Sequence, residues 1–592
     1  MSVNAQPKDP IRLALSQLNA RVGDLQYNAA QIAAVIRRAG DSGVHIVAFP
    51  ELALTGYPPE DLLLRPKFIA ETQTALLHIA EETRRYPSMM VIVGFIERRE
   101  VLFNSAAILH NGELIATYQK QYLPNYGVFD ENRYFQQGNS TFLIQFQSAL
   151  IGVSICEDIW YPTGPATIQG YSGADLLINI SASPYHAQKW VERERMLATR
   201  AADTGALLAY VNMIGGQDEL VFDGGSCIFS ETGAILARSP VFTEDLLMAD
   251  LSLEGAFRQR LRDPRLRQAH MAQTPQIISV PVVYTPIEGH AKLVSHIAPH
   301  VDEDEEIYEA LKLGVRDYVQ KNGFHDVVIG LSGGIDSALT AVIAADALGA
   351  EHTHGVLMPS QYSSEGSLTD AAQLAQNIGI HTFTLPIQPM VDAAAALLQA
   401  PLGDLVFGLA YENIQSRARG ITLMALSNAL RWLVLTTGNK SEMSVGYATL
   451  YGDMAGGFAV LKDVWKTQVY RLAQFRNARA GFDLIPRASI EKAPSAELRP
   501  DQRDTDSLPP YEILDPILQA YIENDIDLEE IISLGFDEHS ARRAVQMTDN
   551  NEYKRRQAPP GVKVTRRAFG RDRRFPLTNG YHEWTVKKTY DQ

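Results

Sequence analysis

The sequence VVIGLSGGIDS, from Val327 to Ser337, decides the fold of the second half of the chain. Its apolar start, Val327–Ile329, is typical of a buried strand, and the run Ala338–Ala341 after it is typical of a helix. Backbone N–H groups at a helix N-terminus lack partners within the helix, and the helix dipole favours negative charge there. Glycines let the backbone approach an anion closely. The stretch therefore predicts an anion-binding turn between a strand and a helix.

Asp336 indicates which anion this turn would bind. No lysine follows the glycines, so this is not the phosphate loop that ends in GKS or GKT. Asp336 would repel a bare phosphate, and it suits a polyphosphate only if Mg²⁺ lies between them. The alternative is an ordinary glycine-rich turn, but SGGxDS after an apolar strand is much rarer than a lone SGG. The loop resembles that of the ATP pyrophosphatase (PP-loop) family, which cuts ATP between its α- and β-phosphates and passes AMP to a substrate oxygen.

Composition limits the class of protein. The 592 residues carry a formal net charge of −16, which argues against a protein that binds nucleic acid or a membrane surface as a whole. The polar N-terminus lacks the apolar region of a secretory signal. The nearest apolar run, Ile421–Leu435, contains polar residues and predicts a buried amphipathic helix rather than a membrane span. Two cysteines favour a reduced, cytoplasmic protein with no disulfide framework and no structural zinc site.

The first half of the chain mixes strand and helix patterns. Residues 11–19 and 45–49 read as strands, 26–39 as a helix, and Asn111-Gly112 as a tight hairpin turn. Further strands are expected at Leu150–Cys156, Asp175–Ile180 and Ala206–Val211. Because helices join some strand pairs and hairpins join others, the pattern predicts a layered α/β sandwich rather than a simple doubly wound sheet.

Three chemically capable residues, Glu51, Lys120 and Cys156, each follow an apolar strand or turn. Taken singly, they could be a capping carboxylate, a surface lysine and a small core residue. Taken together, they suit nucleophilic attack on an amide. A thiol is weakly ionised at neutral pH, so Cys156 would need a base such as Glu51, and a cation such as Lys120 would stabilise the developing oxyanion.

The contexts of these residues are FPELALTGYPPEDLL, YQKQYLPNYGVFDENRYF and GVSICEDIW. Together they resemble the nitrilase superfamily of carbon–nitrogen hydrolases over about residues 10–250, and this resemblance implies an α-β-β-α sandwich. The resemblance implies that Glu51 accepts the proton, that Lys120 is the catalytic lysine and that Cys156 is the nucleophile. It also implies that Glu131 is a supporting carboxylate.

A branch of this superfamily is a glutaminase joined to a synthetase. The positions that contact glutamine in that branch match Tyr126, Ser183 and Lys189 here. Tyr126 could equally be a packing aromatic, and Lys189 a surface charge on a helix. Cys227, in GGSCIFS, has no comparable context and is expected in the core.

A connector separates the two halves. Residues 253–276 are polar and charged, and the acidic run Asp302–Glu306 precedes the second half. The predicted domains are therefore a nitrilase-like domain at 1–260, a connector at 261–300 and a nucleotide-binding domain at 301–592. In the last domain, helix and strand patterns alternate regularly. They predict a doubly wound parallel sheet with ligand at the carboxyl ends of the strands.

The segments SGGIDS, YENIQSRAR, TTGNKSE, YGDMAGGF and VWKTQV closely resemble the NAD synthetase family over about residues 300–592. Members adenylate the nicotinate carboxylate of deamido-NAD, and ammonia then displaces AMP. The resemblance implies that ATP is bound by Ser332, Gly333, Gly334, Ile335, Asp336, Ser337, Thr437, Lys466 and Ser495. It implies that deamido-NAD is bound by Asn413, Glu442 and Lys554, and Mg²⁺ by Asp336 and Glu442.

Some features depart from the single-domain members of that family. Those members have a lysine and an aspartate where this chain has Leu450 and Gly457, so the nicotinate end is expected to be bound somewhat differently. The segment Pro486–Pro510 is rich in proline and charge and predicts a mobile segment near the ATP site that orders on binding. The basic tail from Tyr553 could be a solvated terminus or contact nucleic acid. The resemblance favours contact of Lys554 with the dinucleotide, and no nucleic-acid partner is expected.

The two halves use ammonia in opposite ways, since one releases it and the other consumes it. Free ammonia is mostly protonated at neutral pH, so the fusion predicts a shielded passage within or between subunits. The combined resemblance implies ATP-dependent amidation of deamido-NAD to NAD with glutamine as donor, in a cytoplasmic homo-oligomer with no membrane partner. The alternatives are a glutaminase that feeds a GMP- or asparagine-forming PP-loop enzyme, and a chain in which one half is a degenerate binding module.

Overall fold

The computed structural model describes residues 9–271, 276–281, 293 and 296–584. They form two compact units: the described residues of 1–217 and 222–300 group in the first, and those of 218–221 and 301–592 in the second. Residues 272–275, 282–292 and 294–295 of the expected connector lie outside the described residues. The boundaries 1–260, 261–300 and 301–592 stay a prediction about domains.

The first unit contains two large sheets with strand orders β14-β1-β2-β3-β4-β5 and β13-β12-β9-β8-β7-β6-β15. The first sheet comprises β1 (Ile11–Gln17), β2 (Ile46–Ala48), β3 (Met90–Arg98), β4 (Leu102–His110), β5 (Glu113–Gln119) and β14 (Asp245–Leu251). The second comprises β6 (Phe142–Phe146), β7 (Ala149–Ile155), β8 (Leu176–Ser181), β9 (Leu207–Asn212), β12 (Cys227–Phe229), β13 (Ile235–Arg238) and β15 (Gln276–Val280). A separate hairpin consists of β10 (Ile214–Gln217) and β11 (Leu220–Asp223).

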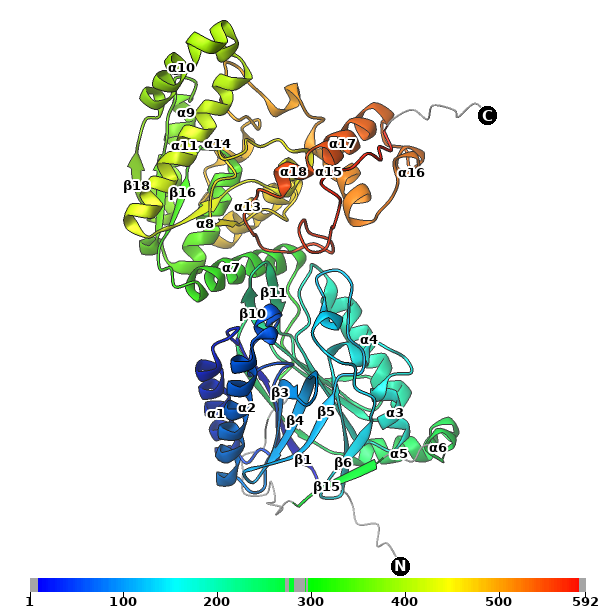
Figure 1. Ribbon diagram of the computed structural model, residues 1–592. Helices are drawn as coiled ribbons and strands as arrows, with labels where there is room; N and C mark the ends of the chain where they lie inside the picture. The colour runs from blue at the N-terminus through cyan, green and yellow to red at the C-terminus, as the bar shows by residue number, and fades with distance from the viewer. Residues whose placement is uncertain (1–8, 272–275, 282–292, 294–295, 585–592) are drawn as a thin grey trace, which may run out of the picture. The chain divides into compact units, whose positions relative to one another are not determined.

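The two sheets pack face to face and helices cover their outer faces (Figure 1). Apolar side chains at alternate strand positions, such as Ile92 and Ile178, form the core between the sheets. The first sheet is covered by α1 (Leu25–Asp41) and α2 (Pro66–Glu82), and the second by α3 (Pro165–Tyr171) and α4 (Lys189–Thr204). Two helices follow the last strand of the first sheet, α5 (Glu254–Arg262) and α6 (Pro264–Met271). This architecture confirms the predicted α-β-β-α sandwich.

The second unit contains a five-stranded sheet of order β18-β17-β16-β19-β20, and all its neighbours are parallel. Its strands are β16 (Val327–Gly330), β17 (Thr353–Leu357), β18 (His381–Thr384), β19 (Leu433–Thr436) and β20 (Phe458–Ala459). The chain order reverses at β16, whose neighbours are β17 and β19, and ligands bind at such switch points. The predicted parallel sheet is confirmed.

Helices pack on both faces of this sheet. Val328, Val356 and Val434 point toward α10 (Gln388–Leu402) and α11 (Leu409–Leu430). The opposite face packs on α8, and the helices nearest that face are α7 (Glu303–Lys321), α8 (Ile335–Leu348), α9 (Glu365–Ile378) and α13 (Lys466–Ala480). A helical region follows, with α14 (Arg487–Glu491), α15 (Tyr511–Leu518), α16 (Leu528–Ser533), α17 (Glu538–Asn550) and α18 (Glu552–Arg555). Most of that region packs on α12 (Lys440–Val445).

One sequence prediction was wrong here. Ile421–Leu435 is not one buried helix: α11 ends at Leu430, Arg431 adopts a left-handed φ of 59°, and β19 starts at Leu433. Ile421 also keeps 58% of its surface exposed. Among the described residues, one helical stretch, Gln388–Phe407, is long and apolar enough to cross a membrane by length and composition. One such stretch is weak evidence for a membrane span.

Candidate active sites

The first site lies where three strands of the first unit end. Glu51 follows β2, Lys120 follows β5, and Cys156 follows β7, so the residues come from both sheets. The Lys120 Nζ lies 2.6 Å from Glu51 Oε1 and 2.8 Å from an oxygen of Glu131, which belongs to the short turn Glu131–Arg133. The structure therefore places the predicted lysine between the two predicted carboxylates.

Neighbouring groups hold both carboxylates in place. The Asn104 Nδ2 donates to Glu51 Oε1 at 2.7 Å, and the backbone N–H of Ala182 donates to the other oxygen at 3.0 Å. The Tyr57 hydroxyl donates to Glu131 at 2.9 Å. Because every donor is buried, the carboxylates have one orientation before any substrate binds.

Electrostatics set the protonation states of this site. Burial alone would lower the pKa of Lys120, but the charges of Glu131 and Glu51 outweigh burial and raise it well above its usual value. Burial, followed by the charge of Glu51, raises the pKa of the Cys156 thiol. Burial also raises the pKa of Glu131 to about 7. The site therefore holds an ammonium and a protonated thiol, and the thiol needs a base before it can attack.

The backbone at Cys156 is strained. Its φ is 44°, in the left-handed region that residues with a side chain rarely adopt. Cys156 opens the short turn Cys156–Ile159 directly after β7, and its side chain is buried at the end of the strand. Strained backbone of this kind gathers at sites where a side chain must point in one direction.

The predicted glutamine-binding residues lie near Cys156 or near the partners of Glu51. The Tyr126 hydroxyl lies 3.0 Å from both oxygens of Glu157, the residue after Cys156. Ser183 follows Ala182 and donates its N–H to Asn212. Lys189 opens α4 and donates to the Pro184 carbonyl at 2.6 Å.

Glu157 was missed by the sequence analysis. Burial raises its pKa, and the positive charges of Lys120 and Lys189 act against this rise. Its position in the sequence CED could have identified it, because Glu157 directly follows the predicted nucleophile Cys156. Cys227 lies in the core against α4, as expected.

The second site is built on the turn after β16. The Ser332 and Ser337 hydroxyls lie 3.1 Å apart, and the Gly334 N–H donates to Ser332 Oγ at 3.2 Å. Gly333 has a φ of 79°, and a Cβ there would lie 2.3 Å from the Ser367 carbonyl. The glycine is therefore required by both conformation and space. Ile335 begins α8, so the turn presents a helix N-terminus as predicted.

Asp336, Glu442 and Lys466 form a charged group beside this turn. Lys466 makes an ion pair with Asp336, and its Nζ lies 3.6 Å from Glu442. The Asn439 side chain donates to Asp336 at 2.9 Å, and its backbone N–H donates to Glu442 at 3.3 Å. Burial and then the charge of Asp336 raise the pKa of Glu442 to about 8.

One cavity gathers most of the predicted nucleotide residues. Its lining includes Ser332, Gly334, Ile335, Asp336, Ser337, Thr437, Glu442, Lys466 and Ser495. Asn413 and Lys554 lie next to this lining rather than in it. The Thr449 hydroxyl, which lines the cavity, donates to Asn413, and Lys554 donates to the carbonyls of Gly446 and Ala448.

Further residues of this cavity were not predicted. Arg419 lines it and donates to the Met358 carbonyl at 3.3 Å, and burial lowers the pKa of its guanidinium. Ser416 and Gly420 line the cavity too. Ser416 and Arg419 are three residues apart within YENIQSRAR, and this helical spacing could have revealed the face of α11 that lines the cavity. Lys492 and Glu497 also line it and form an ion pair of 2.6 Å.

The segment predicted to be mobile therefore contributes to the cavity wall. Residues 492–498 of Pro486–Pro510 all belong to the lining. Glu497 accepts hydrogen bonds from Ser364 and Ser367 at the start of α9. That this segment orders when a ligand binds stays a prediction.

The two departures from the single-domain pattern have local explanations. The Leu450 carbonyl accepts from Arg417, and its side chain packs in the cluster around α15 and α17. A Cβ at Gly457 would lie 2.3 Å from Leu433. A side chain at Gly457 would therefore require the Leu433 side chain to move.

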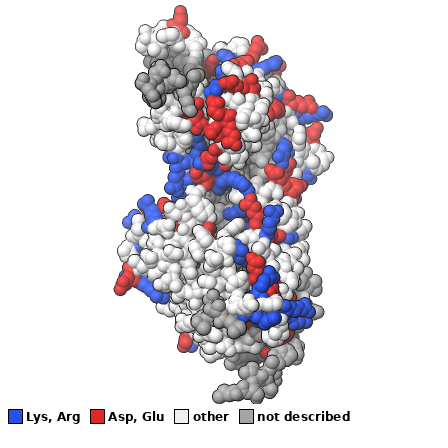
Figure 2. Space-filling view, turned by 90° about the vertical axis from the view of Figure 1, so that its right-hand side faces the viewer, with Lys and Arg blue, Asp and Glu red and all other residues white. Residues whose placement is uncertain are grey.

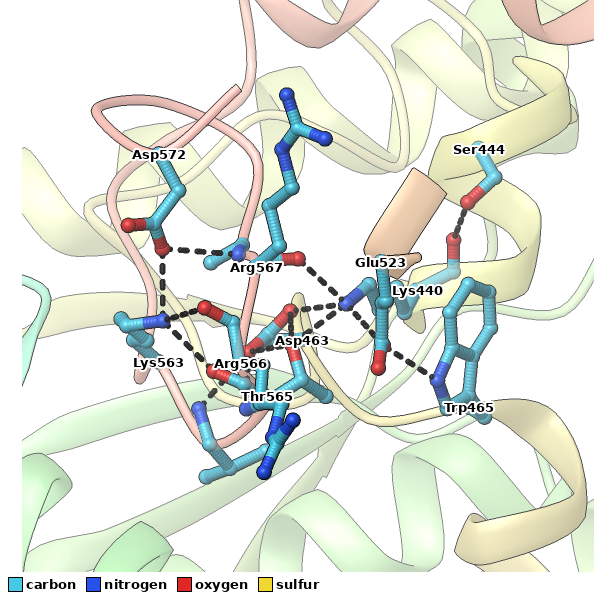
Figure 3. A network of polar contacts seen from close by, with 12 residues as sticks. Lys440, Ser444, Asp463, Trp465, Glu523, Lys563, Thr565, Arg566, Arg567 and Asp572 are labelled. Carbon is cyan, nitrogen blue, oxygen red and sulfur yellow. Dashed lines mark hydrogen bonds and ion pairs between the residues drawn. The ribbon is translucent and has the colours of Figure 1, made fainter. Parts of the chain in front are cut away.

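A buried network anchors the helix that carries Glu442 (Figure 3). Lys440, the first residue of α12, points its Nζ at Asp463, Glu523 and Thr565 at 2.8, 2.7 and 2.6 Å. Asp463 also accepts the backbone N–H of Thr565. The network thus ties three segments, at Asp463, Glu523 and Thr565, to the start of α12.

The charged group fits a magnesium ion. Mg²⁺ is usually held by one or two carboxylates, water and substrate phosphates. Asp336 and Glu442 both face Lys466, so both already point toward a positive charge. Among the described residues, no cluster of three or more His, Cys, Asp or Glu side chains could hold a metal without further ligands. Phosphate oxygens would have to complete this site.

Fold and sites together define an enzyme that joins an amide-hydrolysing cysteine site to a nucleotide-dependent ligase site. A carbon–nitrogen hydrolase family model matches residues 12–260, and an NAD synthase model matches residues 307–558. The chain is 47% identical over 579 residues to the glutamine-dependent NAD(+) synthetase of Thermotoga maritima, covering 97% of this chain and 99% of that protein. It is 48% identical over 571 residues to that of Aquifex aeolicus, covering 96% and 100%.

A solved structure gives the same result. The glutamine-dependent NAD+ synthetase of Acinetobacter baumannii, in complex with ADP, matches with a TM-score of 0.72 and 37% identity. The match covers 98% of this chain and 100% of that chain. This chain therefore belongs to the glutamine-dependent NAD(+) synthetase family, and it is a ligase that uses glutamine.

Proposed function

We propose that this chain amidates deamido-NAD to NAD at the expense of ATP, with ammonia that it releases from glutamine. The products are AMP, diphosphate and glutamate. The observation that carries the proposal is the presence of both complete sites in one chain. Lys120 between two carboxylates serves Cys156, and Lys466 between two carboxylates serves the nucleotide cavity.

At the first site, Glu51 takes the proton of Cys156 as the sulfur attacks the amide carbon of glutamine. The Lys120 ammonium, held by two carboxylates, stabilises the oxyanion that forms. The proton on Glu51 leaves with ammonia, and a water activated by Glu51 hydrolyses the thioester. Glu157 is the partner for the α-ammonium of glutamine, and Lys189 for its α-carboxylate.

At the second site, ATP lies with its phosphates at the N-terminus of α8 and against Lys466. Asp336 and Glu442 would hold Mg²⁺, which would offset the charge of the polyphosphate. A nicotinate carboxylate oxygen attacks the α-phosphorus and diphosphate leaves. Ammonia then attacks the activated carbonyl carbon and AMP leaves. Asn413, Arg419 and Lys554 contact the dinucleotide.

The test is a product analysis. The purified full chain is incubated with Mg²⁺, ATP, deamido-NAD and glutamine, and the products are identified by mass spectrometry. NAD, AMP, diphosphate and glutamate are expected together. Glutamate without NAD would overturn the proposed second half, and a screen of other acceptors would then test GMP- or asparagine-forming chemistry. That alternative is not favoured by the comparisons.

The variant Cys156→Ala separates the two halves. It removes the nucleophile, so glutamine-dependent formation of NAD is lost. Ammonia-dependent formation remains, because the second site binds its substrates without Cys156. A matched variant, Cys227→Ala, removes the other buried thiol and keeps both activities. If Cys156→Ala lost both glutamine-dependent and ammonia-dependent formation of NAD while Cys227→Ala kept them, the proposal of two separate sites would be contradicted.

We also infer that the chain is a cytoplasmic homo-oligomer. The helices α10 and α11 and the turn between them expose Leu397, Leu405 and Leu409, at 78, 79 and 72%. No Lys or Arg occurs from 388 to 409, so this face lacks the basic residues of a membrane-surface helix. A second copy of the chain is the proposed occupant. Two free thiols, Cys156 and Cys227, suit a reducing compartment.

The oligomer is tested with Leu397→Asp and Leu405→Asp in sedimentation and light scattering. Both variants should lower the measured mass to that of a smaller species. An unchanged mass, or binding of the wild-type chain to vesicles, would contradict the proposed occupant. Figure 2 shows one face of the molecule, which carries both Lys and Arg and Asp and Glu. The proposed ligands are small molecules alone.

A further inference from the structure

Asp158 is a buried acid that the mechanism above leaves without a role. It lies two residues after Cys156, and 0% of its surface is exposed. Its carboxylate accepts four hydrogen bonds, two on each oxygen. One oxygen accepts the backbone N–H groups of Gln121 and Tyr122 at 3.0 and 2.9 Å. The other accepts the Tyr118 hydroxyl at 2.8 Å and the backbone N–H of Ile155 at 3.0 Å.

The donors belong to the two segments that carry the chemistry. Gln121 and Tyr122 directly follow Lys120 after β5, and Ile155 directly precedes Cys156 at the end of β7. The strand β5 belongs to one sheet and β7 to the other. One carboxylate thus bridges the sheets at the two points where the lysine and the nucleophile are attached.

The environment argues that Asp158 does more than fill space. Burial raises the pKa of Asp158 to about 6 even though the hydrogen bonds from Ile155, Tyr122 and Tyr118 lower it. An apolar side chain of the same size would avoid the cost of burying a charge. The bond to Ile155 also braces the turn in which Cys156 has its strained φ of 44°.

We infer that Asp158 is a positioning residue for the first half-reaction: its carboxylate sets the distance and direction between the Lys120 ammonium and the Cys156 thiol. It acts through the backbone of both segments and touches neither reacting atom. The inference rests on the proposed amide hydrolysis at Cys156. The inference adds Asp158 as a residue that fixes the relative position of Lys120 and Cys156 in that hydrolysis.

The test compares Asp158→Asn with a matched buried acid. Asparagine keeps the size, but its NH₂ group cannot accept, so two donors lose their acceptor. The matched variant is Asp175→Asn. Asp175 is also fully buried, and it binds the N–H of Leu150 at the opposite end of β7, at 2.9 Å. If Asp158 had only a structural role, Asp158→Asn and Asp175→Asn should change kcat and the alkylation rate by similar factors.

For Asp158→Asn we expect kcat for glutamine hydrolysis to fall about 100-fold, because small misplacements of reacting groups cost that much. KM should change less than about threefold, since the glutamine contacts remain. Alkylation of Cys156 by iodoacetamide should slow about tenfold, as it depends on the charges around the sulfur. Ammonia-dependent formation of NAD should be unchanged. In Asp175→Asn, kcat and alkylation should match the wild type.

Several outcomes would overturn the inference. A wild-type kcat and alkylation rate in Asp158→Asn would do so, and so would equal losses in Asp175→Asn. If Asp158→Asn does not fold, Tyr118→Phe decides, because it removes one hydrogen bond and keeps the ring. We expect its kcat to fall about three- to tenfold, and a wild-type kcat would overturn the inference. The alkylation assay needs no substrate, so it separates this failure from failure of the proposed function.

Discussion

Both units hold a lysine between two carboxylates, yet the surroundings of Lys120 and Lys466 differ. In the first unit the two carboxylate side chains are 0 and 5% exposed. In the second they keep 18 and 19% of their surface open to a cavity. The first arrangement is closed to solvent by protein on all sides, whereas the second faces the space that a nucleotide would occupy.

The difference in exposure indicates that the same arrangement, one lysine between two carboxylates, has a different role in each unit. Around Lys120 the carboxylates are held by Asn104, Tyr57 and a backbone N–H, so the group acts as it stands. Around Lys466 the carboxylates are held mainly by Asn439. The group of Glu51, Lys120 and Glu131, called the closed group below, is therefore preorganised by more contacts. The group of Asp336, Glu442 and Lys466, called the open group, has fewer contacts and faces the cavity.

The largest expected effect comes from Lys120→Met, which removes the cation from the closed group. Two buried carboxylates would then face each other, and unfolding should become easier by about 3 kcal/mol, as found when a buried pair loses one partner. Glutamine hydrolysis should fall by at least about 1,000-fold, because the oxyanion loses its cation. Urea unfolding and glutamate release measure the two effects.

The control for this variant is ammonia-dependent NAD formation, which should persist. A stability change below about 1 kcal/mol would show that the closed group is not held by its lysine. Such a small change would also mean that the groups around Lys120 and Lys466 do not differ in how their lysine contributes to stability.

The next effect is that of Lys466→Met in the open group. Stability should fall by only about 1–2 kcal/mol, because water reaches the carboxylates and one of them can take a proton. NAD formation should fall about 100- to 1,000-fold with either glutamine or ammonia, since phosphate charge loses a partner. Glutamine hydrolysis without ATP should change less than about threefold. Equal destabilisation by Lys120→Met and Lys466→Met would contradict the contrast.

The comparison also shows what sequence can reveal. Glu51, Lys120, Cys156 and Asp336 could be singled out because each lies a few residues after an apolar strand. The sandwich and the parallel sheet followed from the order of strands, helices and hairpins. Residues that act through folded neighbours gave weaker signals. Lys466 was predicted as a phosphate ligand, but its place between two carboxylates depends on three helices that are far apart in sequence, α8, α12 and α13.

Local backbone conformation also limited how well the end of α11 could be predicted from the sequence. The helix α11 ends at Arg431, which has a φ of 59° although it is neither glycine nor asparagine. No glycine or proline marks this point, so periodicity alone extended the predicted helix to Leu435. Exposure was also not predictable from the apolar pattern, because Ile421 lies in a segment predicted to be buried and yet keeps 58% of its surface exposed.

A smaller effect is expected for the pH dependence of magnesium binding. Burial and Asp336 raise the pKa of Glu442 to about 8, so this acid is mostly protonated at pH 7. A protonated carboxylate cannot bind the metal, so affinity for Mg²⁺ with ADP should rise with pH and level off above about 8. Simple titration predicts about a fivefold gain from pH 7 to pH 8.

Calorimetry at several pH values measures this affinity and the protons released. In Glu442→Gln the affinity should be lower and the rise with pH should disappear. The matched variant Glu157→Gln lies in the first unit and should keep the rise. A wild-type affinity that is level from pH 7 to pH 9 would contradict a shared metal site at Asp336 and Glu442.

The smallest effect tests the closed group through Tyr57→Phe. The Tyr57 hydroxyl donates to Glu131 and holds its pKa down, although burial still raises that pKa to about 7. Without the hydroxyl, the pKa of Glu131 should rise further, and stability should fall by about 1 kcal/mol.

The sign of the pH effect follows from the raised pKa of Glu131. Between its ordinary value and about 7, the unfolded chain loses the proton while the folded chain keeps it, so stability falls as pH rises and then levels off. In Tyr57→Phe this fall should extend to higher pH, and the acidic limb of kcat for glutamine hydrolysis should move the same way. Thermal unfolding and kcat across neutral pH measure both shifts. The variant Tyr134→Phe, whose hydroxyl contacts Asp61 on the surface, should leave them in place. An unchanged limb in Tyr57→Phe would mean that Glu131 does not titrate as part of the group around Lys120.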